Sequence, residues 1–413
     1  MPDDMFQHSH RLGVLKLSRC TFSFSLPPFL CCHSLRFLWL DHCQDIQTRT
    51  HNIDAEKEEE LDHNTTVLWE CFQSLWVLDL RHTDCDQILS AWVMNLMIQL
   101  RELNVMGAKN WDMSHLQGRL RNIRKLRVTK STCYFNNNVL SDMGNMELLD
   151  FSGNIIRQGM TILSGPESNN SLRTVIIGGC DGLKIISFRG CKELKNLFLK
   201  GSLGNINELD LSGTRVKTLD FGGVETSSIP KKLILLGCEK LRAILWPQKA
   251  SHLLSACYIW DRPTQSYFYN LNLLHLDHCP RLVHVLPFSR WEGDTLGALE
   301  TLEIVSCGDL REVFPLDPQL QEQDKILEFP KLRHIHLHEL PMLQHISGCR
   351  MWAPKLETIK IRGCCSLKRL PLIGRNTMQP KVDCEKEWWY NLEWDGLEKY
   401  HHPSLYEPSH SLY

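Results

Sequence analysis

One apolar pattern recurs along most of the chain, and it constrains the fold more than any other feature. The pattern is L-x-x-L-x-L-x-x-C, in which other apolar residues can replace Leu, and Thr, Asn or Ser often replaces Cys. Its nine places are called template positions 1 to 9. A repeat of this length predicts a solenoid of about 13 to 15 turns, because each unit packs only on its neighbours. The copies are Leu12–Cys20, Leu35–Cys43, Leu75–Thr83, Leu100–Ala108, Ile123–Ser131, Met146–Asn154, Leu172–Cys180, Ile206–Thr214, Pro230–Cys238, Leu271–Cys279, Leu299–Cys307, Leu332–Leu340 and Leu356–Cys364.

The spacing within each copy predicts one strand with a single buried face. Positions 4 and 6 are apolar and alternate with more polar residues, which is the period of a half-buried strand. Position 9 then needs a small group that satisfies backbone amides where the strand ends. We therefore expect an α/β repeat solenoid of the leucine-rich-repeat type, a horseshoe with a parallel concave β-sheet and a mostly irregular convex side.

A second apolar triplet follows several copies and predicts a core contact on the convex return. Leu310 and Val313 form such a triplet after Cys307, and Leu367 and Leu370 form one after Cys364. Between residues 172 and 224, some steps shrink to about 11 residues, too short for a whole repeat. In that stretch the pattern leaves open which triplets are strands and which are returns.

Three insertions interrupt the repeats, at residues 44–70, 247–270 and 316–325. The first contains an acidic run and is expected to be a solvated or disordered convex loop. The second is rich in aromatic residues and is expected to pack on the solenoid. A Trp-rich segment ends the chain, with Trp388, Trp389, Leu392 and Trp394 expected to cover the edge of the last turn. The predicted organisation is a solenoid over residues 1–383 and a C-terminal cap and tail over residues 384–413.

Composition narrows the classes of function. The 413 residues include 43% hydrophobic and 23% charged residues, with a net charge of −2. This balance gives no support for nucleic-acid binding, which usually needs a basic face. No apolar run is long enough for a membrane helix, and the 17 cysteines show no C-x-x-C spacing. We expect a cytoplasmic protein with free thiols and no membrane contact.

Catalytic and cofactor motifs are missing from the sequence. It has no G-x-x-x-x-G-K-[ST] phosphate loop and no G-x-S-x-G nucleophile elbow. His334, His336 and His338 alternate on one predicted strand, but the adjacent strands offer one carboxylate, Glu303, as a further metal ligand. We expect neither an enzyme nor a bound cofactor or metal.

Template positions 3, 5 and 7 should project from the concave sheet, so their side chains are candidates for contact with a protein partner. Phe37 and Trp39 are large and apolar there without a core role, which favours either an interface or packing against a preceding segment. The last basic strand could dock an acidic loop of the same protein or remain solvated. The candidate contact residues are Phe37, Trp39, Asp41, Asp79, Arg81, Lys125, Arg127, His334, His336, His338, Lys360 and Arg362.

Several short motifs in the chain resemble those of a known family. The repeats include LDHC at 40–43, LDHCP at 276–280 and IRGC at 361–364. The tail pattern Trp-Trp-x-x-Leu-x-Trp at 388–394 is followed by His401-His402-Pro403-Ser404-Leu405. With these motifs the chain resembles the C-terminal leucine-rich-repeat region of plant nucleotide-binding immune receptors, in particular those of grasses.

The resemblance implies a sensor module of plant immunity. Its concave face would recognise a pathogen effector or a host protein and regulate a receptor switch, with a nucleotide-binding receptor domain as a second partner. The phosphate loop and the Met-His-Asp signature of that domain do not occur here, which indicates a truncated receptor, a partial gene product or a piece that acts beside a partner. The alternative is a substrate-recruiting leucine-rich-repeat adaptor of a ubiquitin ligase, although residues 1–11 are too short for an F-box.

Overall fold

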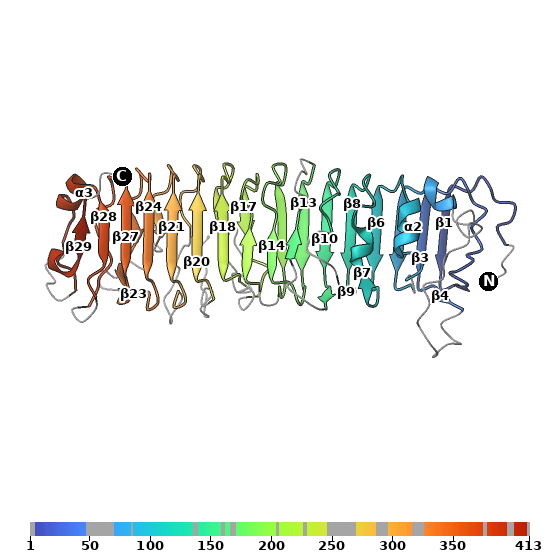
Figure 1. The fold of residues 1–413 in the computed structure, drawn as a ribbon, viewed down its shortest axis with the longest axis horizontal. Helices are drawn as coiled ribbons and strands as arrows, with labels where there is room; N and C mark the ends of the chain where they lie inside the picture. Colours follow the sequence, from blue (N-terminus) through green and yellow to red (C-terminus); the bar gives the residue numbers. More distant parts are fainter. Residues whose placement is uncertain are drawn as a thin grey trace, which may run out of the picture. The chain divides into compact units, whose positions relative to one another are not determined.

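The structure of the protein is a computed structural model. The structure describes residues 5–46, 70–83, 86–134, 139–157, 162–165, 171–203, 206–225, 229–245, 270–285, 296–315, 326–374, 378–394 and 400–410. The chain divides into two compact units. The first holds Met1–Leu183 and Cys191–Leu194, and the second holds Lys184–Gly190 and Lys195–Tyr413. Both units are built mainly from parallel strands stacked in chain order (Figure 1).

The main sheet of the first unit contains one strand from each repeat. Every neighbouring pair is parallel, and equal template positions face each other, so Phe37 pairs with Val77 and Val77 with Glu102. The strands are β1 (Val14–Ser18), β3 (Phe37–Asp41), β5 (Val77–Arg81), β6 (Glu102–Met106), β8 (Lys125–Thr129), β10 (Leu148–Ser152) and β13 (Thr174–Gly178).

The main sheet of the second unit has the same construction. His336 of one repeat lies between Glu303 and Lys360 of its neighbours. Its strands are β14 (Ile185–Ser187), β16 (Glu208–Asp210), β18 (Lys232–Leu236), β20 (Leu273–Asp277), β21 (Thr301–Val305), β24 (His334–His338), β27 (Thr358–Arg362), β28 (Lys381–Cys384) and β29 (Glu407–Ser409). The predicted parallel-strand leucine-rich-repeat solenoid is confirmed.

The returns between main strands are irregular apart from short strands and helices. In the first unit these are β2 (Thr21–Phe22), β4 (Gln44–Asp45), η2 (Glu70–Ser74), α2 (Ala91–Leu96), β7 (Trp111–Asp112), η3 (Met113–Leu116), β9 (Thr132–Tyr134) and β11 (Ile155–Ile156). In the second they are β17 (Thr218–Asp220), β19 (Ala243–Leu245), β22 (Glu312–Phe314), β23 (Ile326–Glu328), β25 (His345–Ser347) and β26 (Arg350–Trp352). Two further strands belong to the main sheets by their hydrogen bonds: β15 (Asn196–Lys200) is the last strand of the sheet that begins with β1, and β12 (Ile162–Ser164) is the first strand of the sheet that contains β14.

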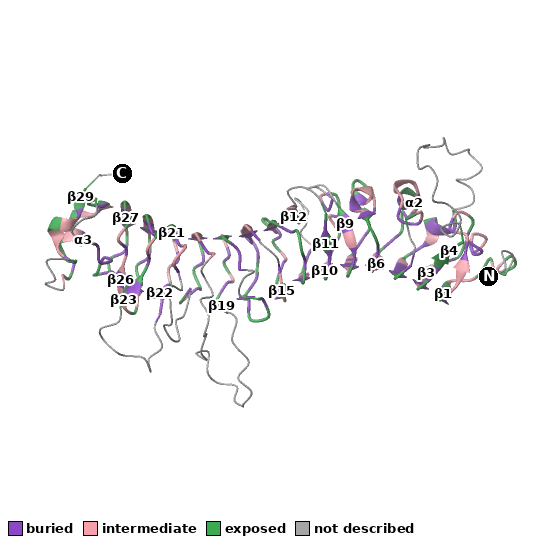
Figure 2. Cartoon of the chain, turned by 90° about the horizontal axis from the view of Figure 1, so that it is seen from below, coloured by how far each residue is buried: buried purple, intermediate pink, exposed green. Residues whose placement is uncertain are grey.

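The core lies between the main strands and their returns. Leu38 and Leu40 of β3 are completely buried, while the residues on either side of them are half-buried, and strands such as β6, β8, β20 and β21 repeat this alternation (Figure 2). The return triplets add a second layer, since Leu310 and Val313 are also completely buried. The expected role of the second triplet is therefore confirmed.

The ambiguous stretch from residue 172 to 224 uses almost every apolar triplet as a strand. In the second unit, β14 pairs with β16 and β16 with β18, so these triplets belong to the main sheet. The alternate triplets belong to the returns, where β17 pairs with β19. The spacing of about 11 residues between triplets fits this arrangement, because successive triplets alternate between the main sheet and the returns, and both layers are extended and apolar.

Template position 9 satisfies backbone groups, as expected. The side-chain oxygens of Thr83, Ser131 and Asn154 accept hydrogen bonds from the amides of Cys43, Ala108 and Ser131, at 3.2, 3.1 and 2.9 Å. Cysteines at this position act differently, because their thiols donate to carbonyls: the Sγ of Cys180 lies 2.8 Å from the carbonyl oxygen of Phe151. The asparagine amide is strong both as a donor and as an acceptor, whereas the cysteine thiol is weak in both roles.

Template position 8 has the left-handed backbone conformation in most repeats. Glycine, which tolerates positive φ, is found there in about half of them, and the others use bulky residues at a cost of order 1 kcal/mol or more each. The residues other than glycine are Arg19, His42, His82, Lys130, His278, Ser306 and Glu339, with φ between 49 and 55° except 46° at His82.

The insertions predicted at 247–270 and 316–325 lie outside the described residues, except for Asn270. The same is true of residues 47–69 of the first insertion, although its beginning forms β4, which pairs with β2.

The C-terminal tail packs on the last repeats. A short helix, α3 (Lys386–Tyr390), buries Trp388, whose Nε1 donates to the carbonyl of Leu367 at 2.8 Å. Trp394 packs against Tyr406, and the strand β29 that follows η6 (Pro403–Leu405) pairs with β28. The tail thus extends the main sheet of the second unit.

Candidate protein-binding face

The open face of each main sheet consists of the side chains at template positions 3, 5 and 7, on the side opposite the core. All twelve candidate contact residues lie at these positions, on β3, β5, β8, β24 and β27. Seven belong to the first unit and five to the second. The open face therefore forms two groups, which are described separately.

The aromatic residues of the first unit are held by cations from neighbouring strands. The Nζ of Lys16 lies 5.5 Å from the ring centroid of Phe37, and the guanidinium of Arg81 lies 5.9 Å from that of Trp39. Arg81 also makes a bidentate ion pair with Asp79, with both N–O distances at 2.9 Å. Asp79 is only 6% exposed as a result. Trp39 and Arg81 are thus placed in one fixed arrangement on adjacent strands.

Asp41 lies at the end of β3 and is bound by its neighbours. The hydroxyl of Ser18 donates to it at 3.2 Å, and Nδ1 of His42 lies 2.9 Å away. Desolvation opposes ionisation of this carboxyl, but the hydrogen bonds from His42 and Ser18 outweigh it and lower the pKa of Asp41. Asp41 therefore presents a negative charge beside the cation of Arg81.

Lys125 and Arg127 of β8 make polar contacts with the preceding strand. Lys125 pairs with Glu102 at 2.6 Å, and Arg127 donates to Asn104 at 3.1 Å. Between β5 and β8 the sheet carries a shallow hollow, lined among others by Arg81, Asn104 and Arg127. Three of the candidate residues of the first unit, Asp79, Arg81 and Arg127, thus line one hollow.

The histidines of the second unit face their strand neighbours individually. His336 lies 3.1 Å from Glu303, which also approaches His275 at 3.8 Å. Nδ1 of His334 lies 2.8 Å from the hydroxyl of Thr358. All three histidines of β24 are half-buried and project from the open face, as their spacing predicted. Within the described residues no three His, Cys, Asp or Glu side chains are grouped closely enough to hold a metal ion.

The two basic candidates of β27 differ in their contacts. Arg362 pairs with Asp383 of the next strand at 2.6 Å, so the acidic partner considered for it is the adjacent strand. Lys360 lies between His336 and Asp383 in the strand register and is exposed. The group in the second unit is therefore a row of alternating histidine, carboxylate and basic side chains.

The thiols do not add a reactive site to these faces. Burial raises the pKa of Cys364 to about 12, which keeps it protonated at neutral pH, in agreement with its predicted inert role at position 9. Cys365, next to it, is exposed. All cysteines in the described part of the chain are free thiols.

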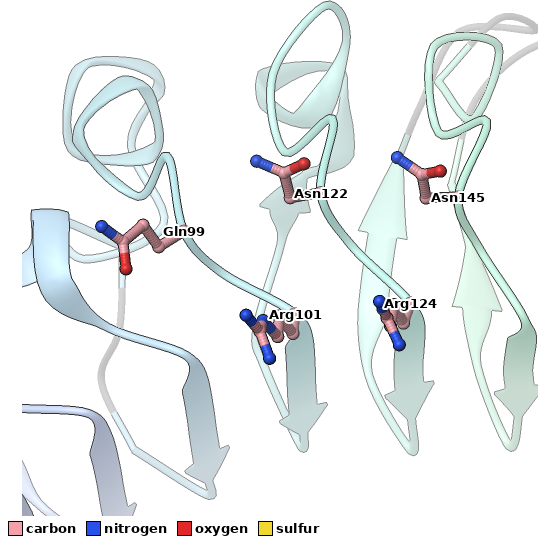
Figure 3. A pocket seen from close by; sticks show the side chains of 5 residues that line it. All are labelled: Gln99, Arg101, Asn122, Arg124 and Asn145. Atoms are coloured by element: carbon pink, nitrogen blue, oxygen red, sulfur yellow. The ribbon is translucent and has the colours of Figure 1, made fainter.

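A further row of side chains was not predicted from the sequence, because it lies at template position 2 and not at the outward positions 3, 5 and 7. Template position 2, just before each main strand, carries Arg36, Trp76, Arg101 and Arg124 in successive repeats of the first unit. Arg101 and Arg124 line a hollow with three carboxamide side chains (Figure 3). Comparison of position 2 across the repeats would have revealed this row.

The repeats, the parallel registers and the layered core define a leucine-rich-repeat protein. Across the described residues no helix is both long and apolar enough to cross a lipid bilayer.

Residues 248–372 match the sequence family described as plant disease resistance protein RPS2-like, leucine-rich repeats. A probable disease resistance protein of Arabidopsis thaliana is 30% identical over 138 residues, which is 32% of this chain and 14% of the relative. A putative disease resistance protein of the same plant is 28% identical over 182 residues, or 41% of this chain and 20% of the relative. The matched repeats thus resemble those of plant disease resistance proteins, and the chain spans a fifth or less of these two relatives.

Solved structures with similar strands include the glycosylated form of the Toll–Spatzle complex from Drosophila. It has a TM-score of 0.39 and 14% identity, and the match covers 92% of this chain and 54% of that one.

Proposed function

We propose that the chain is a protein-binding module of plant innate immunity, whose open face recognises a pathogen effector or a host protein. In the cytoplasm of a plant cell, this binding would regulate a receptor switch that includes a nucleotide-binding domain. The module makes and breaks no bond and holds no cofactor. Its effect comes from binding two receptor states with different affinities.

The observation that carries the proposal is the fixed aromatic and basic group on β3 and β5. Aromatic residues and arginine are enriched at protein interfaces and dominate their binding energy. Here Trp39 and Arg81 are held in place by cation–π contact and by the ion pair with Asp79. Side chains that are ordered before binding lose less conformational entropy on association. The similarity of the repeats to disease resistance proteins supports the role in defence.

Site-specific photo-crosslinking in plant cells tests the proposal. A benzophenone amino acid is placed at Arg127 or His336 on the open faces, and at Tyr134 or His345 on the return strands β9 and β25 as matched controls. We expect one protein to be cross-linked from Arg127, from His336, or from both, and not from the return strands. The cross-linked protein is then identified by mass spectrometry.

The identified protein must also bind the purified chain directly. The Trp39→Ala and Arg81→Ala variants should weaken that binding by about tenfold or more each, the effect expected of interface anchors. Equal cross-linking from the open and return strands, or unchanged affinity of both variants, would contradict the proposed role of the open face.

A further inference from the structure

The strand-start row of the first unit consists of the side chains at template position 2: Arg36, Trp76, Arg101, Arg124 and Glu147. These residues are direct neighbours, because the amide of each one donates to the carbonyl of the one before it, at 2.7–2.8 Å. Each step along the row therefore equals one strand spacing, about 4.8 Å. The row borders the main sheet and is distinct from the open face.

Trp76 is fixed between two guanidinium groups. Arg36 and Arg101, from the strands on either side, lie 5.2 and 4.7 Å from its ring centroid. Arg36 is anchored by a 2.6 Å hydrogen bond to the carbonyl of Ser74, and Nε1 of Trp76 donates to Gln99 at 3.2 Å. Trp76 nevertheless remains 39% exposed. An exposed tryptophan ordered in this way is a surface suited to binding.

Arg101 and Arg124 have donors available for a ligand. The guanidinium of Arg101 lies over the ring of Trp76, and among the described residues it makes no hydrogen bond or ion pair. Arg124 approaches Glu147 at 3.7 Å, and both of these side chains are largely exposed. Each guanidinium has five N–H groups in a planar fork that matches a carboxylate. Two adjacent carboxylate-binding groups therefore face solvent.

Carboxamides form the other wall of this hollow. Gln99, Asn122 and Asn145 follow one another at one residue per repeat, beside Arg101 and Arg124 (Figure 3). Asn122 donates to the carbonyl of Ile98 at 2.8 Å, and Asn145 makes the equivalent bond to the carbonyl of Arg121, one repeat earlier, at 3.1 Å. These bonds fix the amides and leave a second N–H and the oxygen of each for a ligand.

The step along the row selects the conformation of that ligand. An α-helix rises 5.4 Å per turn, within about 0.6 Å of the strand spacing, and residues four apart in a helix lie on one face. Residues on one face of an extended strand are about 6.7 Å apart, which exceeds the spacing of about 4.8 Å along the row by nearly 2 Å at every step. Over three steps a helix stays within about 2 Å of the row, whereas a strand departs from it by more than 5 Å.

We propose that the strand-start row binds an acidic α-helix of a protein partner, with the helix axis across the strands and one turn at each repeat. Carboxylates would pair with Arg36, Arg101 and Arg124, and an apolar side chain would pack on Trp76. The turn opposite Glu147 would carry a basic or neutral residue. The matching helix face thus reads acidic, apolar, acidic, acidic and basic at successive turns. This inference rests on the proposed function only in taking the partner to be a protein.

A designed peptide of about 20 residues, long enough to form a helix in water, tests the inference. It carries this face on an alanine-rich background and is labelled for fluorescence anisotropy at low salt. A control peptide has the same composition, but its glutamates are two residues apart and do not share a face. A third peptide has the same charges but contains prolines that prevent helix formation. We expect the designed peptide to bind the full chain at least tenfold more tightly than either control.

Charge-reversal variants locate the binding. The double variant R101E/R124E should lose at least tenfold in affinity, because two carboxylate-binding groups become repulsive. The matched control is K217E/R242E, which makes the same charge change at two exposed neighbours that precede β17 and β19 in the second unit. This control should change the affinity less than twofold. Thermal unfolding of both variants verifies that they remain folded.

Three outcomes overturn the inference: equal binding of the helical and proline-containing peptides, equal binding of the two helical peptides, or equal loss in the two double variants. The first would indicate an extended acidic segment, and the last would indicate nonspecific attraction. Cross-linking from the open face does not depend on these residues. If a partner is captured from the open face and binds the R101E/R124E variant normally, the proposed function stands and the helix-binding site at the strand-start row is wrong.

Discussion

Replacement of Asn154 by alanine tests the role assigned to template position 9. Asn154 is completely buried, its Oδ1 accepts from the amide of Ser131 at 2.9 Å, and its Nδ2 donates to the carbonyl of Val128 at 2.7 Å. Asn154→Ala removes both partners and leaves two backbone groups buried without a hydrogen bond. Each such group costs roughly 1–3 kcal/mol, so the free energy of unfolding should fall by about 3 kcal/mol.

Cys180 provides the matched control, because it occupies the same template position in the next repeat. Its thiol is a weak donor to two carbonyls, that of Phe151 at 2.8 Å and that of Gly178 at 3.6 Å. A buried carbonyl that loses a weak donor is less costly than an orphaned amide, so Cys180→Ala should cost about 1 kcal/mol. Asn154→Ser should recover part of the loss, because a hydroxyl at this position can accept the amide, as the Ser131 hydroxyl does from Ala108.

The assay combines urea denaturation with native-state hydrogen exchange. A fall in the midpoint with an unchanged slope reports a change in stability and not in the unfolded state. Hydrogen exchange should show the loss of protection concentrated at the amide of Ser131. If Asn154→Ala costs less than about 1 kcal/mol, or Cys180→Ala costs as much as Asn154→Ala, the role assigned to the asparagine is wrong.

Three further results are expected. Gly107→Ala should lower the free energy of unfolding by about 1–2 kcal/mol, because the φ of Gly107 is +74° and an added Cβ would lie 2.3 Å from the ring of His82. In a thermal melt, the additional substitution His82→Ala should recover the part of this loss that comes from the steric clash. Trp388→Phe should cost about 1–2 kcal/mol and raise hydrogen exchange in the last turn, by removing a buried hydrogen bond. In the native protein at pH 8, iodoacetamide should label Cys365 and not Cys364, whose pKa is about 12, and mass spectrometry of the peptides would contradict the assignment if both were labelled.

The strands could be predicted from the sequence because the repeat requires alternation of buried and exposed residues. Leu38 and Leu40, at the apolar positions of the repeat, are both buried, because the apolar residues define which face of the strand turns to the core. The stretch from 172 to 224 could not be assigned, because strands and returns there carry equally apolar triplets. Only the pairing of β14 with β16, and of β17 with β19, separates the two layers.

The positions of the candidate residues could be predicted, but their contacts could not. Asp79 occupies an outward template position, yet it is 6% exposed because Arg81 folds over it. Such contacts depend on rotamers and cross-strand distances, which the repeat does not specify. The neighbours Arg36 and Trp76 are 40 positions apart in the chain, and the insertion between them hides their adjacency. The backbone hydrogen bond from Trp76 to Arg36 places the two side by side.

The constant register of neighbouring strands has a consequence for how such a surface can diversify. Every repeat presents the same template positions to the next, so duplication or loss of one whole repeat preserves the type of each core contact. On the surface the result is different. Loss of a repeat between β5 and β8 would move charged groups by one step of about 4.8 Å and change their order. Unequal recombination between repeats could thus alter which partner is recognised in one event, without waiting for compensating substitutions in the core.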